Sequence, residues 1–180
     1  SIHLANNKIE SLPEEFFTRL PCLADIDIHR NHLKEIPTNI EQCKRLLAFN
    51  IGYNLLTTLP EEMAACKLLE RLDITGNKMK VIPPVVTKLT NLYRFYASNM
   101  LLKELPDDFG NLVHLDKLNL NGNCFTSLPK KLLELPKLSY LGFRYHGIIS
   151  VPEEIDRLTE LTVLHVGNNP NLLSLPAQLA

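Results

Sequence analysis

Eight prolines at a nearly constant spacing constrain this chain more than any other feature of its 180 residues. Each follows an aliphatic residue, and the steps between them are 24, 23, 23, 23, 23, 23 and 24 residues. A fixed period of this length is typical of a solenoid, in which repeats that cannot fold alone stack into one body. The eight pairs are Leu12-Pro13, Ile36-Pro37, Leu59-Pro60, Ile82-Pro83, Leu105-Pro106, Leu128-Pro129, Val151-Pro152 and Leu175-Pro176.

Within each period, aliphatic residues follow a strand-like pattern. In the fullest copy, which begins at Leu69, the alternation places Leu72 and Ile74 on the inner side and their neighbours on the outer side. Ile82 and Val86 are predicted to join the same core. Short strands are predicted to stack as one parallel sheet, at about residues 2–5, 24–28, 47–51, 70–74, 93–97, 116–120, 139–143 and 162–166.

Parallel strands need a crossover that returns along the other side of the core. Proline suits the first turn of such a return, where a helix N–H has no partner. Acidic residues follow several of the prolines, as in Pro60-Glu61-Glu62, where a helix dipole favours negative charge. Segments such as 61–68 and 130–135 are therefore predicted to be short helices or 3₁₀ turns on the convex side.

This pattern resembles the leucine-rich repeat in its 23-residue form, LxxLxLxxNxLxxLPxxLxxLxx, over the whole chain as eight repeats. The resemblance implies an α/β fold, a right-handed solenoid with a curved parallel sheet inside and short helices or 3₁₀ turns outside. The Leu/Ile-Pro variant with 23-residue repeats resembles that of intracellular Ras-scaffold, polarity-scaffold and Roco-type proteins, and the closing segment 168–176 is similar to a segment of Ras-scaffold repeats. Those relatives hold signalling proteins together without catalysis, which implies a cytoplasmic scaffold with a protein partner such as a small GTPase.

A recurrent asparagine marks the turn after most predicted strands. A buried amide both donates and accepts, so we expect it to serve the backbone of its own repeat and of the next one. Met100 and His146 hold this place in repeats five and seven, with Asn99 expected to substitute through a one-residue slip. We expect the ladder of amides to be weakest at His146, which could supply one of the two hydrogen bonds but hardly both. Its members are Asn7, Asn31, Asn54, Asn77, Asn123 and Asn169.

Composition excludes several classes of function. The 19 Lys and Arg residues against 20 Asp and Glu residues give a net charge of −1, which argues against nucleic acid or anionic membrane as the main partner. No apolar run approaches the roughly 18 to 20 residues that a membrane span needs. Neither end shows a capping pattern. We therefore expect residues 1–180 to be one uncapped repeat domain of a longer protein, monomeric as a fragment.

The residues also lack the patterns of a catalytic, cofactor or metal site. No P-loop, G-x-S-x-G or dinucleotide-binding glycine pattern occurs, and the His29–His32 spacing beside Asp25 and Asp27 matches no familiar ligand set. We expect no cofactor, no metal and no enzymatic activity. Four cysteines are too few for a disulfide scaffold, and Cys43 and Cys66 share a convex core position. Free thiols favour a reducing compartment.

The aromatic residues divide by type. Six of the seven phenylalanines, namely Phe16, Phe49, Phe95, Phe109, Phe125 and Phe143, replace leucine at predicted core positions. All five tyrosines occupy variable positions of the strand segment that are predicted to face outward on the concave side. Tyrosine is a frequent interface anchor, apolar in body with a polar tip.

Basic residues share the predicted concave face with the tyrosines. Arg71, Arg94 and Lys117 hold the same outward position in three successive strands, either to bind an acidic patch on a partner or to be neutralised by Glu70, Asp73 and Asp116. The predicted partner-binding residues are Tyr53, Arg71, Tyr93, Arg94, Tyr96, Lys117, Tyr140, Arg144 and Tyr145. Two other classes stay open, an extracellular recognition or adhesion ectodomain and the regulatory repeat segment of a kinase, GTPase or ubiquitin ligase.

Overall fold

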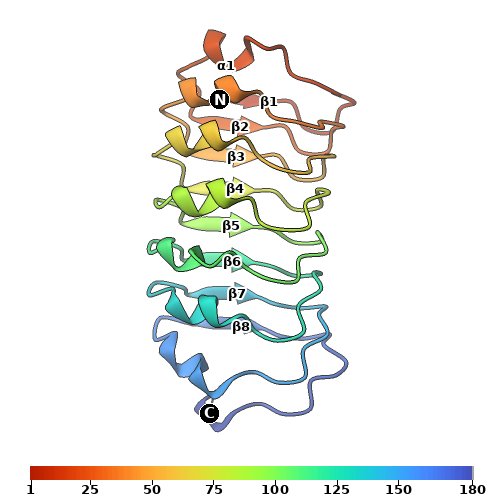
Figure 1. Ribbon diagram of the computed structural model, residues 1–180, viewed down its shortest axis with the longest axis vertical. Coiled ribbons are helices and arrows are strands. Elements are labelled where there is room, and N and C mark those ends of the chain that lie inside the picture. Colours follow the sequence, from red (N-terminus) through yellow and green to blue (C-terminus); the bar gives the residue numbers. More distant parts are fainter. Residues whose placement is uncertain (180) are drawn as a thin grey trace.

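A computed structural model describes residues 1–179 of the chain, in which eight strands stack along the long axis of the molecule (Figure 1). The strands form one parallel sheet in sequence order, and each lies inside its predicted window, which confirms the predicted solenoid of eight repeats. They are β1 (Ile2–His3), β2 (Asp25–Asp27), β3 (Ala48–Asn50), β4 (Arg71–Asp73), β5 (Arg94–Tyr96), β6 (Lys117–Asn119), β7 (Tyr140–Gly142) and β8 (Val163–His165).

The return segments are one turn of α-helix followed by seven 3₁₀ helices, as predicted for the convex side. Proline precedes the helix instead of opening it: Pro60 has φ −69° and ψ 142°, and its carbonyl accepts from the Met63 N–H at 3.1 Å. The missing proline N–H costs nothing at this position. The elements are α1 (Phe16–Arg19), η1 (Thr38–Gln42), η2 (Glu61–Ala65), η3 (Pro84–Lys88), η4 (Phe109–Asn111), η5 (Lys130–Glu134), η6 (Glu153–Arg157) and η7 (Ala177–Leu179).

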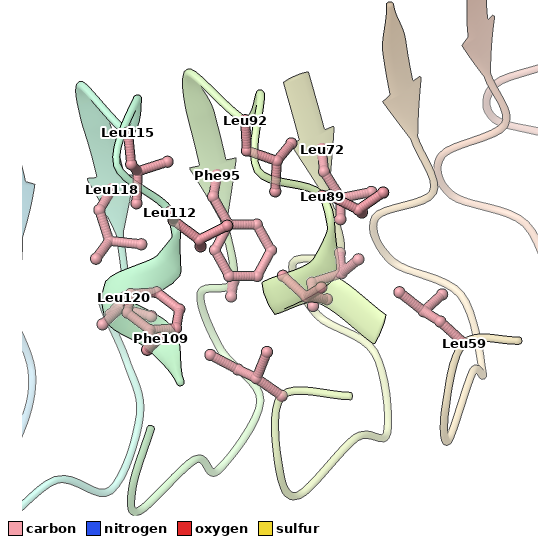
Figure 2. Close-up of a cluster of buried hydrophobic side chains, with 14 of the residues drawn as sticks. Leu59, Leu72, Leu89, Leu92, Phe95, Phe109, Leu112, Leu115, Leu118 and Leu120 are labelled. Carbon is pink, nitrogen blue, oxygen red and sulfur yellow. The ribbon is translucent and has the colours of Figure 1, made fainter. Parts of the chain in front are cut away.

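The core runs between the sheet and the return segments. Leu72, Ile74, Ile82 and Val86 are all buried, as the periodicity predicted. Figure 2 shows Phe95 from β5 and Phe109 from η4 meeting in this layer, with their ring centroids 6.4 Å apart. Burying each large apolar side chain contributes about 1.5–3 kcal/mol, so stacked repeats stabilise one another.

The prediction that Phe16 occupies a core position is wrong. Phe16 is only partly buried, and its neighbour Phe17 occupies the core and meets Phe49 edge-on at 6.5 Å. Ile40 is the third residue after its proline, whereas Phe17 is the fourth after Pro13. The extra residue of this 24-residue repeat therefore lies between Pro13 and Phe17, which moves the core position by one. The other five predicted phenylalanines are buried.

The asparagine ladder joins each repeat to the one before it, not to the one after it as predicted. The Asn77 side-chain nitrogen donates to the Ile74 carbonyl of its own repeat at 2.8 Å and to the Ile51 carbonyl of the preceding repeat at 3.0 Å. Its oxygen accepts from the Leu56 N–H at 3.1 Å. Five of the six predicted members are buried, and Asn7 in the first repeat is exposed.

The predicted substitution by Asn99 does not occur, because Asn99 is exposed and has a left-handed backbone with φ 56°. Its conformation is one of a series, since each repeat has one left-handed residue directly before the ladder position. These φ values lie between 53° and 70°. We call this series the left-handed row: Asn6, Arg30, Tyr53, Gly76, Asn99, Gly122, Tyr145 and Asn168.

Candidate partner-binding surface

We call the outward-pointing side chains of β1 to β8 the sheet face. Parallel register sets equivalent positions of neighbouring strands side by side, so Arg71 lies beside Arg94, and Arg94 lies beside Lys117. The predicted alignment of these three bases, which we call the basic row, is therefore confirmed. Neighbouring strands lie about 4.8 Å apart, so the row spans about 10 Å.

The basic row has little internal compensation. The Arg71 guanidinium lies 3.6 Å from the Asp25 carboxylate, and both side chains are about half exposed. Within residues 1–179, no carboxylate lies within 4.0 Å of the charged nitrogens of Arg94 or Lys117. The geometry therefore does not support neutralisation by Glu70, Asp73 and Asp116.

Two of those carboxylates have other partners. The Asp73 carboxylate accepts from the Thr75 N–H at 2.9 Å. Burial raises the pKa of Asp73, while hydrogen bonds from Thr75 and the charge of His29 oppose the rise. Asp116 acts on Tyr93, because hydrogen bonding to its carboxylate and the negative charge of that group raise the pKa of the Tyr93 hydroxyl.

Polar residues at the third position of the strands mostly serve the fold. Asp27, Asn50 and Asn119 each accept from the N–H two residues further along the chain, at 3.1–3.2 Å, as Asp73 does. These bonds end the strands. Tyr96 holds the same register position in β5, and its side chain lies on the sheet face without such a bond.

The five tyrosines occupy three different places. Tyr96 and Tyr140 are partly buried strand residues, and the Tyr140 hydroxyl lies 3.1 Å from Nδ1 of His165. Tyr93 precedes β5, beside the Arg94 guanidinium, which lies 5.7 Å from its ring centroid. Tyr53 and Tyr145 lie past the strand ends, in the left-handed row, and are 45% and 60% exposed.

Three of these tyrosines line one polar hollow, although they come from repeats three, five and seven. Tyr96 and Tyr53 meet there with Tyr145, and the remaining lining is hydroxyl, amide and carboxylate groups from Asp73, Thr75, Ser98, Asn99, Asn119 and Asn121. Tyr93 lies elsewhere, in a hollow with Leu68, Glu70, Asn91 and His114. The structure therefore brings Tyr53, Tyr96 and Tyr145 together and separates Tyr93 from them.

Two residues that the sequence reasoning missed hold Tyr53 in place. The Arg30 guanidinium lies 5.4 Å from the Tyr53 ring centroid, at the distance of a cation–π contact. On the next repeat, a Cβ at Gly76 would lie 2.5 Å from Cδ1 of Tyr53, so only glycine leaves room for the ring. The sequence did contain a sign that Gly76 has a structural role, because Gly76 and Gly122 both directly precede a ladder asparagine.

Acidic residues gather in an adjoining hollow of the sheet face. Asp25, Asp27 and Asp73 line it with His3, Arg71 and Tyr96, and the sequence reasoning did not predict it as a site. The Asp27 carboxylate lies 2.7 Å from Nδ1 of His29. Across the described residues, no group of three or more His, Cys, Asp or Glu side chains is arranged to hold a metal ion.

Further features bear on the predicted classes. All four cysteines are free thiols; Cys43 and Cys66 are buried as predicted, and Cys22 and Cys124 are exposed. Among residues 1–179, no helix has both the length and the apolar character that crossing a membrane requires. Arg144 is partly buried beyond β7, and its N–H donates to the Asn121 side chain at 2.7 Å.

Comparison with known proteins gives the family. No protein-family model matches the chain. A leucine-rich-repeat protein of Leptospira interrogans superimposes on 99% of this chain and 45% of its own with a TM-score of 0.93, at 31% sequence identity. The chain is a leucine-rich-repeat protein. The plant peptide hormone receptor RGFR1 in complex with RGF2 shares the fold, with a TM-score of 0.70 and 23% identity over 91% of this chain and 31% of that one.

Curated leucine-rich-repeat relatives match shorter segments. Bovine osteomodulin is 42% identical over 55 residues, or 31% of this chain and 13% of its own length. Mouse PH domain leucine-rich repeat-containing protein phosphatase 1 is 37% identical over 62 residues, or 34% of this chain and 4% of its own. The chain thus spans a small part of these relatives. The leucine-rich-repeat fold is generally a non-catalytic scaffold that binds proteins or peptides.

Proposed function

We propose that this leucine-rich-repeat domain binds a protein partner on its sheet face and on the turns at the two ends of the strands, through Tyr53, Arg71, Tyr93, Arg94, Tyr96, Lys117, Tyr140, Arg144 and Tyr145. The observation that carries the proposal is the basic row set beside Tyr96 on an open sheet, where Arg94 and Lys117 lack a carboxylate within 4.0 Å in the described chain. Tyrosine and arginine are enriched among residues that dominate binding energy. Two plant receptors with the same fold, RGFR1 in complex with RGF2 and HAESA in complex with an IDA peptide hormone, bind peptides, which supports the same use of the fold here.

We further propose that the domain acts in the cytoplasm as a non-catalytic signalling scaffold, with a partner such as a small GTPase. Four free thiols support a reducing compartment. Immunostaining of the endogenous protein tests the location, because a cytoplasmic epitope becomes accessible only after the membrane is permeabilised. Staining of intact cells would instead support an extracellular recognition domain, the class that a receptor-kinase ectodomain among the structural neighbours favours.

A regulatory segment of a larger enzyme is the other candidate function, favoured by the match to a leucine-rich-repeat protein phosphatase. Affinity purification of the endogenous protein at its natural length separates this candidate from a scaffold. A scaffold yields no phosphatase, kinase, GTPase or ubiquitin-ligase activity in the purified chain. An activity that changes when the repeat domain is deleted would identify a regulatory segment.

The binding face is tested by capture of a partner on the immobilised domain, followed by titration of the captured protein. Tyr96→Ala or Arg94→Ala should weaken binding by roughly thirtyfold, since a residue that dominates binding contributes at least about 2 kcal/mol. The melting temperature should stay nearly unchanged. The matched convex changes Glu61→Ala and Lys131→Ala should leave both quantities unaltered. Binding that survives the sheet-face changes and fails with the convex ones would move the site to the outer surface.

A further inference from the structure

Charge on the sheet face is separated along the stack. Asp25 and Asp27 lie on β2, whereas Arg94 and Lys117 lie on β5 and β6. Arg71 and Asp73 on β4 mark the boundary, where the two signs meet. The chain as a whole has a net charge of only −1, so this separation is local and not a consequence of composition.

The basic row does not stabilise the sheet that carries it. Like charges directly opposed on neighbouring strands destabilise a sheet, and Arg94 has a base on both sides. Hydrophobic core packing already determines the register through Leu72, Phe95 and Leu118. The alignment of three bases therefore opposes folding, and in the described residues it is offset only by the Arg71–Asp25 ion pair and the contact of Arg94 with the Tyr93 ring.

The hydrogen-bonding capacity of these bases is also largely unused. The Nε atom of Arg94 is buried, and within residues 1–179 it has no hydrogen-bond acceptor; the same holds for Nε of Arg144. Buried polar atoms in folded proteins normally have a partner. Within residues 1–179 the Asp116 carboxylate forms no ion pair with these bases, and the Asp73 carboxylate accepts from the Thr75 N–H.

We propose that the partner element docking on this face is an acidic peptide segment, whose carboxylates pair with Arg71, Arg94 and Lys117. This inference rests on the proposed function, because it names the chemistry of the partner for the same surface. Carboxylates match arginine well, since a guanidinium can bind both carboxylate oxygens at once. The row spans about 10 Å, which two or three acidic side chains of an extended chain can cover, since alternate residues lie about 6.6 Å apart.

The acidic residues on β2 influence where along the sheet face an acidic peptide docks. Asp25 and Asp27 on β2 repel a negative segment from that end of the sheet face, which favours placing its acidic residues over the basic row on β4 to β6. Tyr96 lies next to this stretch, in the same strand as Arg94, and offers an apolar ring to the residues between the acids.

The experiment uses three fluorescein-labelled 12-residue peptides that alternate serine with glutamate, glutamine or lysine. Fluorescence anisotropy with the purified chain should show the glutamate peptide binding at least tenfold more tightly than the glutamine peptide, and the lysine peptide more weakly than either. The preference for glutamate should fall as salt is added, because exposed charges are screened. Equal affinities for the three peptides, or tighter binding of a 12-nucleotide thymidine strand than of the glutamate peptide, would overturn the proposal.

Matched charge-reversal variants locate the site. Arg94→Glu with Lys117→Glu should weaken the glutamate peptide at least tenfold, whereas Lys88→Glu with Lys131→Glu, the same charge change on the convex side, should leave its affinity unchanged. Far-ultraviolet circular dichroism confirms that both pairs fold. Retained binding by the sheet-face pair overturns the inference. If Tyr96→Ala still weakens a captured protein partner while that charge reversal does not, the proposed function stands and only the acidic partner is rejected.

Discussion

The side-chain oxygen of Asn123 accepts a hydrogen bond from the backbone N–H of Met100 at 3.0 Å. The same oxygen accepts from the Leu102 N–H, also at 3.0 Å. At Asn77 the equivalent oxygen has one such donor, Leu56. The additional bond satisfies the N–H of Met100, the residue that holds the ladder position in the preceding repeat.

Asn123→Ala should therefore destabilise the domain more than Asn77→Ala. Both changes remove a side-chain donor to two carbonyls, but Asn123→Ala leaves one more buried N–H without an acceptor. An unsatisfied buried donor costs about 1–3 kcal/mol, which is the expected difference between the variants. Urea unfolding measures both free energies. Equal losses would show that the second bond adds nothing.

His146 makes stability depend on pH. It holds the ladder position of repeat seven, is 5% exposed, and neither ring nitrogen has a hydrogen-bond partner among residues 1–179. Burial lowers its pKa from the ordinary 6.5, and backbone groups of Asn123 and Leu120 oppose the shift. As the pH falls below 6.5 the unfolded chain takes up this proton first, so stability decreases until the folded-state pKa is passed.

The variant His146→Asn should lack the part of the pH dependence of stability that His146 causes. The free energy of unfolding of the natural chain should fall more between pH 7.5 and pH 5.5 than that of the variant. The variant should also be more stable at both values, because asparagine at this place can donate to carbonyls as Asn123 and Asn169 do. An unchanged difference between the two pH values would exclude His146 as the titrating group.

The periodic features of this fold could be predicted from the sequence. Strand windows, return segments and buried positions such as Leu72 follow from hydrophobic spacing. Because this spacing repeats eight times, a position that is ambiguous in one repeat is assigned from the equivalent positions of the others. The misplaced core phenylalanine lies in a 24-residue repeat, where the position of the extra residue leaves no mark on the sequence. The direction of the amide ladder depends on how repeats stack, which spacing alone does not determine.

The candidate surface was less predictable. Register follows from the period, and so the alignment of Arg71 with Arg94 was predicted. The partners of a charged group depend on side-chain direction, so whether Asp116 would face a base or Tyr93 could not be predicted. Glycine and asparagine favour left-handed backbone, but Arg30, Tyr53 and Tyr145 adopt it only because the solenoid repeats the turn.

Leu118→Ala tests the core assignment. Leu118 is completely buried in β6, with repeats on both sides, so truncation removes burial and leaves a cavity at a cost of about 2–5 kcal/mol. Leu173→Ala is the matched control, since Leu173 is 88% exposed, and it should change stability by less than about 0.5 kcal/mol. Thermal unfolding compares the two. Equal effects would contradict the assigned repeat phase.

The reactivity of the four cysteine thiols also tests which repeat positions are buried. Cys22 and Cys124 are exposed and should react with iodoacetamide in the folded state, whereas Cys43 and Cys66 are buried and should not. Burial also raises the pKa of Cys66 to about 11, which suppresses the reactive thiolate near neutral pH. Mass spectrometry should find two adducts on the folded chain and four in urea. Labelling of Cys66 before Cys124 would be incompatible with the described core.

Gly76→Ala should displace Tyr53 without altering Tyr53 itself. Gly76 has φ 70°, which costs an alanine about 1–2 kcal/mol, and the new Cβ would lie 2.5 Å and 2.8 Å from two atoms of the Tyr53 ring. The ring must then leave its place beside Arg30. Fluorine NMR of 3-fluorotyrosine should show the Tyr53 resonance moving while that of Tyr140 stays in place.

Gly147→Ala is the control for that displacement, because its new Cβ would meet only the Phe125 carbonyl, at 3.8 Å, and no left-handed backbone is required. If Tyr53 belongs to the partner-binding surface, Gly76→Ala should weaken partner binding about as much as Tyr53→Ala, and Gly147→Ala should not weaken it. A moved Tyr53 resonance with full partner affinity would remove Tyr53 from the site, since the ring would then be dispensable in the position that the structure gives it.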